Sequence, residues 1–183
     1  MSNTNTLFLG LHLLGFFVLT LWFPVVLGQS PAPTPGGQLV KVEYDAGKNF
    51  TQISLNPIVL ASRKLEELRL GAISGYPGKT RSKPKEIILI ILSLSHTDEN
   101  RYEVARKLTA VADGQRFDWG ETRRTKQAQN GLFIEMMVAN VPMDDFLFVS
   151  KAKVVRIKIG LTEVELSSPQ IDILRLTASY FTE

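Results

Sequence analysis

Residues 155–166 read VRIKIGLTEVEL, and this stretch decides the fold class. It consists of two runs in which apolar and polar residues alternate, separated by Gly160-Leu161. Glycine in the first central position favours a type II′ turn, which joins antiparallel strands with the twist they need. The register contains two apolar pairs on one face and two pairs of opposite charge on the other: Ile157–Val164, Val155–Leu166, Lys158–Glu163 and Arg156–Glu165. Turn chemistry, alternation and charge therefore agree on a β-hairpin.

The residues that precede this hairpin predict more antiparallel sheet. Asp113-Gly114 is a preferred pair for a two-residue turn in which both central residues have positive φ. The register around that turn sets aliphatic residues opposite polar or aromatic ones: Ala112–Gln115, Ala110–Phe117 and Leu108–Trp119. Alternating or apolar runs predict further strands over residues 39–44, 51–55, 65–76, 87–94 and 132–141. Short strands at this spacing, with few helix signals between them, indicate a β-rich domain.

Three local features refine these strands. Asn56-Pro57 is expected to break the ladder after residue 55, because proline cannot donate a ladder hydrogen bond. Gly71 and Gly75 indicate a bulge or a close approach of two backbones. Residues 87–94, IILIILSL, are apolar on both faces, which is typical of a central strand buried on both sides.

Two segments carry helix signals. Pro142 followed by Asp144 and Asp145 predicts a short helix over residues 142–151, because acids stabilise the positive end of a helix. Ser167 and Gln170 have the spacing of a capping box, which predicts a C-terminal helix over residues 168–181. Its expected apolar face comprises Ile171, Leu174, Ala178 and Phe181, widened by Ile173, Leu176 and Tyr180. The fold class is therefore mainly β (α+β): an antiparallel β-sandwich or barrel-like sheet of seven or eight strands with these two helices.

The segment that precedes the domain is uncharged. No Lys, Arg, Asp or Glu occurs before Lys41, although the chain holds 21 basic and 18 acidic side chains. The apolar run over residues 7–27 is typical of a secretory signal peptide ending at Gly28, so residues 1–28 are expected to be cleaved. Its length also suits a retained anchor in the inner membrane. Either way the rest is exported, periplasmic or extracellular: a Pro/Gly-rich linker over residues 29–38 and a single β-rich domain over residues 39–183.

Several segments carry a family resemblance. They are Tyr44-Asp45, residues 51–57, residues 76–79, residues 112–114 and residues 154–176. Together they resemble a recurrent exported bacterial β-domain, a family of unknown function, and the resemblance covers about Val42 to the C-terminus. It implies a shared fold and a bacterial cell-envelope setting, and it brings no catalytic residue and no cofactor.

Residues suited to catalysis are sparse. The chain has no cysteine, which excludes disulfides, thiolate metal sites and a cysteine nucleophile. His96 is the only histidine of the domain, and the neighbouring Ser95 should point to the opposite face of a strand. Acid–base chemistry would therefore need one of the adjacent carboxylate pairs: Glu66-Glu67, Asp98-Glu99 or Asp144-Asp145. Asp98, Asn100 and Glu103 lack the glycine and spacing of a calcium loop. We predict no catalytic residue, no metal site and no cofactor.

Basic residues gather in two acid-free segments that we interpret as loops. The first contains Lys79, Arg81, Lys83 and Lys85, and the second contains Arg123, Arg124 and Lys126. If the fold brings the two segments together, they form a cationic rim for anionic lipid, glycan or peptidoglycan. The alternative is that both are solvated edges, where lysines deter aggregation of strands. Nucleic acid is not an expected partner, because no aromatic residues interleave with these clusters.

These features predict an exported non-enzymatic β-domain, a binding or structural module of the bacterial cell envelope. Its expected partner is an envelope protein or an anionic surface, with membrane contact only through an uncleaved leader. One alternative is a hydrolase that acts on envelope material with Asp or Glu. The other is an anion-binding surface domain that uses the basic segments.

Overall fold

The computed structural model describes residues 39–97 and 100–182. The expected signal peptide or anchor and the linker lie outside the described residues, as do Asp98 and Glu99. All described residues belong to one unit of the chain, Gly36–Glu183.

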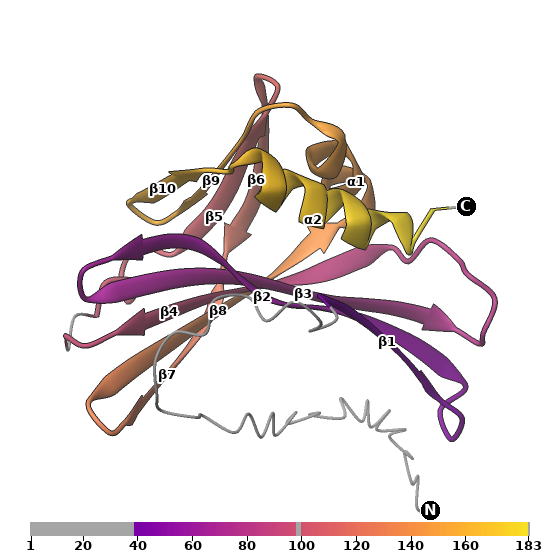
Figure 1. Ribbon diagram of the computed structural model, residues 1–183, viewed down its shortest axis with the longest axis horizontal. Helices are drawn as coiled ribbons and strands as arrows, with labels where there is room; N and C mark the ends of the chain where they lie inside the picture. The colour runs from indigo at the N-terminus through magenta and orange to yellow at the C-terminus, as the bar shows by residue number, and fades with distance from the viewer. Residues whose placement is uncertain (1–38, 98–99, 183) are drawn as a thin grey trace, which may run out of the picture. The chain divides into compact units, whose positions relative to one another are not determined.

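The described residues form ten strands in two antiparallel sheets (Figure 1). The large sheet has the order β1 (Val40–Asp45), β2 (Phe50–Arg63), β3 (Glu66–Pro77), β4 (Glu86–Ser95), β8 (Leu132–Pro142) and β7 (Arg123–Gln129). The small sheet has the order β10 (Thr162–Glu165), β9 (Val155–Ile159), β5 (Lys107–Ala112) and β6 (Gln115–Glu121). The mainly β, antiparallel fold class is confirmed, with two sheets instead of a closed barrel and more strands than expected.

Two helices complete the domain. They are α1 (Met143–Lys151) and α2 (Ser168–Ser179). Both helices and the small sheet lie over the same face of the large sheet (Figure 1). That inner face carries the side chains of the core, among them Ile53, Leu70, Ile91 and Met137, which are all fully buried. The core is therefore the space between the large sheet and the layer formed by the small sheet and the helices.

The hairpin at residues 155–166 has the expected register throughout. β9 and β10 pair Lys158 with Glu163 and Ile157 with Val164. Gly160 has φ +55° and Leu161 has negative φ, as a type II′ turn requires. The capping box of α2 is also confirmed, because the Ser167 backbone N–H donates to the Gln170 side-chain oxygen at 2.7 Å.

The other predicted hairpin is confirmed only in part. Asp113 and Gly114 both have positive φ, and the register holds as far as the pair Thr109–Asp118. The predicted pair Leu108–Trp119 is wrong, because β6 carries a bulge between its pairings with Thr109 and Lys107. The chain then leaves the small sheet and enters β7 of the large sheet, and bulges are common where a strand changes sheets.

β2 is longer than its sequence pattern indicates. The ladder shifts at Asn56-Pro57 as expected, but the strand continues to Arg63 instead of ending there. The shift changes which residues face the core, so that Leu55 and Ile58 both point inward. The expected close approach at Gly75 is confirmed, since a Cβ there would lie 2.3 Å from the Thr51 carbonyl oxygen.

The second basic segment is a strand and not a loop. Arg123–Gln129 forms β7, the edge of the large sheet, and a turn at Asn130-Gly131 with positive φ at both residues joins it to β8. Polar residues on both faces of an edge strand leave no hydrophobic alternation to detect. The Asn-Gly pair, a strong hairpin signal, was the sequence feature that could have revealed it.

The apolar stripe of α2 is narrower than predicted. Ile171, Leu174 and Ala178 are buried as expected, and Ile173 is partly buried against the core. Leu176 is 44% exposed, so its predicted place on the packed face is wrong. The stripe that packs on the domain therefore follows the helical period closely, and the residue beyond it faces solvent.

Candidate functional site

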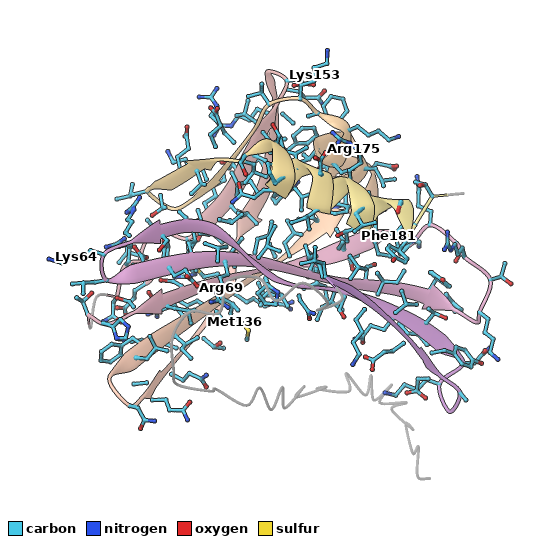
Figure 2. The ribbon with its side chains drawn as sticks, viewed as in Figure 1. Lys64, Arg69, Met136, Lys153, Arg175 and Phe181 are labelled. Atoms are coloured by element: carbon cyan, nitrogen blue, oxygen red, sulfur yellow. The ribbon has the colours of Figure 1, made fainter. Side chains whose placement is uncertain are left out.

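The large sheet has a second face, opposite the helices and the small sheet, which we call the outer sheet face. Figure 2 shows Met136 and Arg69 on this side of the sheet. Its centre consists of eight apolar side chains, all half-buried: Ile73 of β3, Ile88, Ile90, Leu92 and Leu94 of β4, and Ile134, Met136 and Val138 of β8. Cross-strand neighbours shield one another, because Ile90 pairs with Val138 and Leu92 with Met136. Two adjacent central strands thus present an unbroken apolar strip.

Polar side chains surround this strip. Most outward positions of the flanking strands are polar: Lys41, Glu43 and Asp45 of β1, Gln52 and Ser54 of β2, Glu67 and Arg69 of β3, and Arg123, Thr125 and Gln127 of β7. Val59 of β2, which pairs with Arg69, is an exposed apolar residue on this face. Several of the polar side chains bind one another: Lys41 Nζ lies 2.6 Å from Glu43, and Arg69 forms an ion pair with Glu67. An apolar centre inside a polar rim is the usual anatomy of a protein interface.

The prediction that β4 is buried on both faces is half wrong. Ile87, Leu89 and Ile91 face the core and are buried, whereas Ile88 and Ile90 point to the outer sheet face. Among residues 39–97 and 100–182, both helices and the small sheet lie on the other side (Figure 1). The apolar residues on both faces of β4 are the sequence signal for this site, although the same pattern is also typical of a strand buried on both sides.

The first predicted basic segment, Gly78–Lys85, connects β3 to β4 and is already engaged with the domain. Lys79 Nζ lies 4.7 Å from the centre of the Tyr44 ring, and the Arg81 guanidinium lies 5.8 Å from that of Tyr180. Lys83 Nζ lies 2.6 Å from the Asp144 carboxylate. Lys85 is exposed. Three of the four cations thus contact groups of their own chain.

The second basic set is divided between the two faces of β7. Arg123 points to the outer sheet face, where its guanidinium donates to Asn140 Oδ1 at 3.4 Å. Arg124 and Lys126 point to the opposite side, and both donate to Asn100 Oδ1, at 3.1 and 2.8 Å. Arg124 also binds the buried carboxylate of Glu135, at 2.7 Å from its Nε.

The register keeps the two basic sets apart along the sheet. The first basic set ends at Lys85, directly before Glu86, the first residue of β4. Lys126 of the second set pairs with Glu135 of β8, which in turn pairs with Ser93 of β4. Seven residues of strand therefore separate Lys126 from the start of β4, which is about 23 Å at ~3.3 Å per residue. Arg123 lies at the level of Ile90, four residues or about 13 Å from the start of β4. The two basic sets therefore lie at different levels of the sheet, and a single cationic rim stays a prediction.

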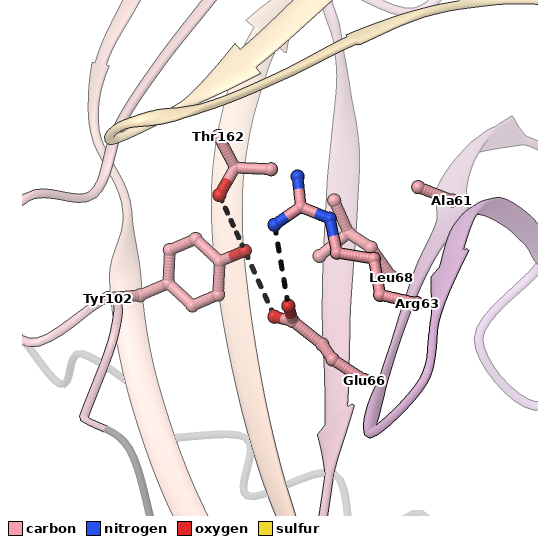
Figure 3. Close-up of a pocket in the computed structure, with 6 residues that line it drawn as sticks. All are labelled: Ala61, Arg63, Glu66, Leu68, Tyr102 and Thr162. Carbon is pink, nitrogen blue, oxygen red and sulfur yellow. Dashed lines mark hydrogen bonds and ion pairs between the residues drawn. The ribbon is translucent and has the colours of Figure 1, made fainter.

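The carboxylates of the first predicted pair lie on opposite faces of β3. Glu67 is on the outer sheet face, and Glu66 points inward to a cluster shown in Figure 3. There Glu66 accepts a hydrogen bond from Ser93 Oγ at 3.1 Å and forms ion pairs with Arg101 and Arg63. The hollow beside Glu66 has room for about one water molecule.

Tyr102 connects this cluster to the small sheet. Its ring is buried, and its hydroxyl lies 3.2 Å from Thr162 Oγ1 and 3.5 Å from Glu66 Oε1 (Figure 3). Burial raises the pKa of the Tyr102 phenol above its ordinary value, and the charge of Glu66 acts in the same direction. The phenol therefore remains protonated and holds β3 of the large sheet to β10 of the small sheet.

We expect Tyr102→Phe to lower the free energy of unfolding by about 1 kcal/mol at neutral pH, through loss of the hydrogen bond. Because the folded-state pKa is raised, the stability due to the neutral phenol is lost as the pH rises past the ordinary tyrosine pKa of about 10. Urea unfolding at several pH values should therefore show a shallower alkaline decline for Tyr102→Phe than for Tyr180→Phe. Equal declines would contradict this role.

Of the other candidate carboxylate pairs, Asp144 and Asp145 are held by separate partners, and Asp98-Glu99 lies outside the described residues. Asp144 binds Lys83, whereas Asp145 accepts a hydrogen bond from Trp119 Nε1 at 3.0 Å. Ser95 is buried and His96 exposed, so the two side chains diverge as expected. In the part of the chain that the structure describes, no group of three or more His, Asp or Glu side chains is placed to hold a metal ion.

Within the described residues, neither helix has the length and apolar character needed to cross a bilayer. No family model, curated protein or solved structure matches this chain.

Proposed function

We propose that this chain is an exported, non-enzymatic binding module of the bacterial cell envelope, and that it docks through its outer sheet face. The observation that carries the proposal is the apolar strip of β4 and β8 inside a polar rim. Solvent-facing strands normally alternate apolar and polar residues, as β1 does, and both β1 and β7 carry polar residues on this face. Apolar residues at successive outward positions of two central strands are stabilised when another molecule covers them.

Export is proposed from the leader. The apolar run at residues 7–27 and the absence of charge before Lys41 support it. The proline-rich residues 29–38 would then act as a spacer between the envelope and the domain.

The carboxylates support binding more than hydrolysis. A glycosidase-type mechanism needs two carboxyl groups that flank one substrate bond, about 5–9.5 Å apart. Glu66 and Glu67 instead face opposite sides of β3, and Glu66 is occupied by Arg101, Arg63 and Ser93. Asp145 is engaged by the Trp119 indole.

Site-specific photo-crosslinking in intact cells tests the docking surface. We expect the photoreactive residue p-benzoylphenylalanine in place of Leu92 to give a discrete crosslinked product. The same residue in place of Leu161, which is 87% exposed at the β9–β10 turn, is the control and should give none. The half-exposed position of Leu92 tolerates a large side chain without disturbing the core. The photoreactive residue is also placed at Met136, the cross-strand partner of Leu92. The proposal is wrong if neither position 92 nor position 136 gives a crosslinked product, or if position 161 gives the same product.

A further inference from the structure

We infer that the molecule that covers the outer sheet face is a second copy of this chain, stacked face to face about a two-fold axis. The inference rests on the proposed function, because it names the partner of the same surface. Its grounds are the size of the face, its charge balance and its internal arrangement.

The face has the size of a stable interface. Its six strands lie about 4.8 Å apart, and β4 and β8 pair over ten residues at ~3.3 Å each. With a two-fold axis between β4 and β8, the strands that overlap are β3, β4, β8 and β7. These four strands give roughly 630 Å² per copy, or about 1,270 Å² in total, and stable interfaces bury about 1,200–2,000 Å² in total. Face-to-face packing of two sheets at a spacing of about 10 Å is also a standard way to bury apolar sheet surfaces.

The charges on the face favour a copy over an anionic surface. The outward strand positions carry three basic residues and four acidic ones: Lys41, Arg69, Arg123, Glu43, Asp45, Glu67 and Glu86. A lipid or polysaccharide surface of negative charge would require a clear excess of cations. A nearly neutral face can meet its own copy without net repulsion.

The arrangement of the face is self-complementary. The apolar strip occupies β4 and β8, with β3 on one side and β7 on the other. An axis that runs between β4 and β8, parallel to them, places Leu92 of one copy over Met136 of the other, since these residues are cross-strand partners. The same axis places β3 over β7, so that Arg69 meets Thr125 and Glu67 meets Gln127. Apolar residues thus meet apolar residues, and no like charges are opposed.

A single-cysteine crosslinking experiment tests this arrangement in the full chain. The protein has no cysteine, so Met136→Cys introduces a unique thiol on the outer sheet face. Two facing sheets are about 10 Å apart, beyond the reach of a disulfide, so a short bismaleimide reagent is applied to intact cells. We expect a product of twice the chain mass, at least about fivefold more abundant than from the exposed control Leu161→Cys.

A second substitution shows whether the apolar strip causes the association. Leu92→Gln in the Met136→Cys chain should reduce the dimeric product about tenfold, because the polar amide would be buried in both copies. Equal yields from Met136→Cys and Leu161→Cys, or no effect of Leu92→Gln, would overturn the inference. A discrete product of another mass at Met136 would also overturn it and leave the proposed function standing. Absence of any product at Met136, with none from the photoreactive residue at Leu92, would reject both.

Discussion

Replacing Gly160 with alanine is expected to lower the free energy of unfolding by about 3 kcal/mol. Gly160 has φ +55°, a backbone conformation that costs an alanine about 1 kcal/mol. A Cβ at this position would also lie 2.0 Å from the carbonyl oxygen of Ala105. The turn cannot simply move away, because the Gly160 backbone N–H donates to the Lys107 carbonyl at 2.9 Å. Urea unfolding followed by circular dichroism measures the loss.

A second glycine serves as a matched control that separates the cost of backbone strain from the cost of the steric clash. Gly114 has φ +86° in the turn between β5 and β6, but an added Cβ would meet no atom within 4 Å. Gly114→Ala should therefore cost only the backbone strain, about 1 kcal/mol. If the two alanine variants lose the same stability, the packing of the β9–β10 turn against Ala105 contributes nothing, and the close contact at Gly160 is wrong.

Local chemistry made this part of the fold predictable. In the hairpin at residues 155–166 the glycine, the alternation and the cross-strand charges all require the same register, and the structure has it. The C-terminal helix was predictable for the same reason, because Ser167 and Gln170 form the cap that their spacing implies. Where only one signal was present, prediction went wrong: the Asp113-Gly114 turn set the register, but nothing in the sequence marked the bulge that interrupts it near Lys107.

The candidate site could not be predicted, because a sequence shows that a strand is apolar but not what lies on each side of it. Leu89 and Ile90 are equally apolar, yet one is buried in the core and the other lies on the outer sheet face. That difference depends on where the small sheet and both helices pack, which is a property of the whole domain. The arrangement of the basic residues could not be predicted for a related reason, since strand alternation sends Arg123 and Arg124 to opposite sides of β7.

The pair formed by Arg124 and Glu135 illustrates what only the structure could show. Glu135 is the one charged residue in the apolar run at residues 132–141, and it is 3% exposed. A carboxylate so deeply buried is costly unless a cation and hydrogen bonds compensate it. The compensating cation comes from β7, the edge strand with no hydrophobic pattern, and its side chain is only 16% exposed.

Removing the cation should therefore be far more damaging than removing the pair. We expect Arg124→Met to lower the free energy of unfolding by about 3 kcal/mol, because the Glu135 carboxylate remains buried without a partner. The double variant Arg124→Met, Glu135→Leu should return to within about 1 kcal/mol of the unaltered protein, since apolar residues of similar volume replace both charges. Lys83→Met, which breaks the exposed pair with Asp144, is the control and should change stability by less than about 1 kcal/mol.

The stability of the double variant, compared with that of Arg124→Met, distinguishes the possible roles of Arg124. If Arg124 served only to cover the edge of the sheet with its aliphatic stem, methionine would replace it at little cost, and the second substitution would bring no recovery. If the ion pair itself added stability beyond compensating the buried charge, the double variant would remain as unstable as Arg124→Met. Recovery in the double variant, together with a small effect at Lys83, is expected only if the arginine compensates a carboxylate that the fold has taken out of water.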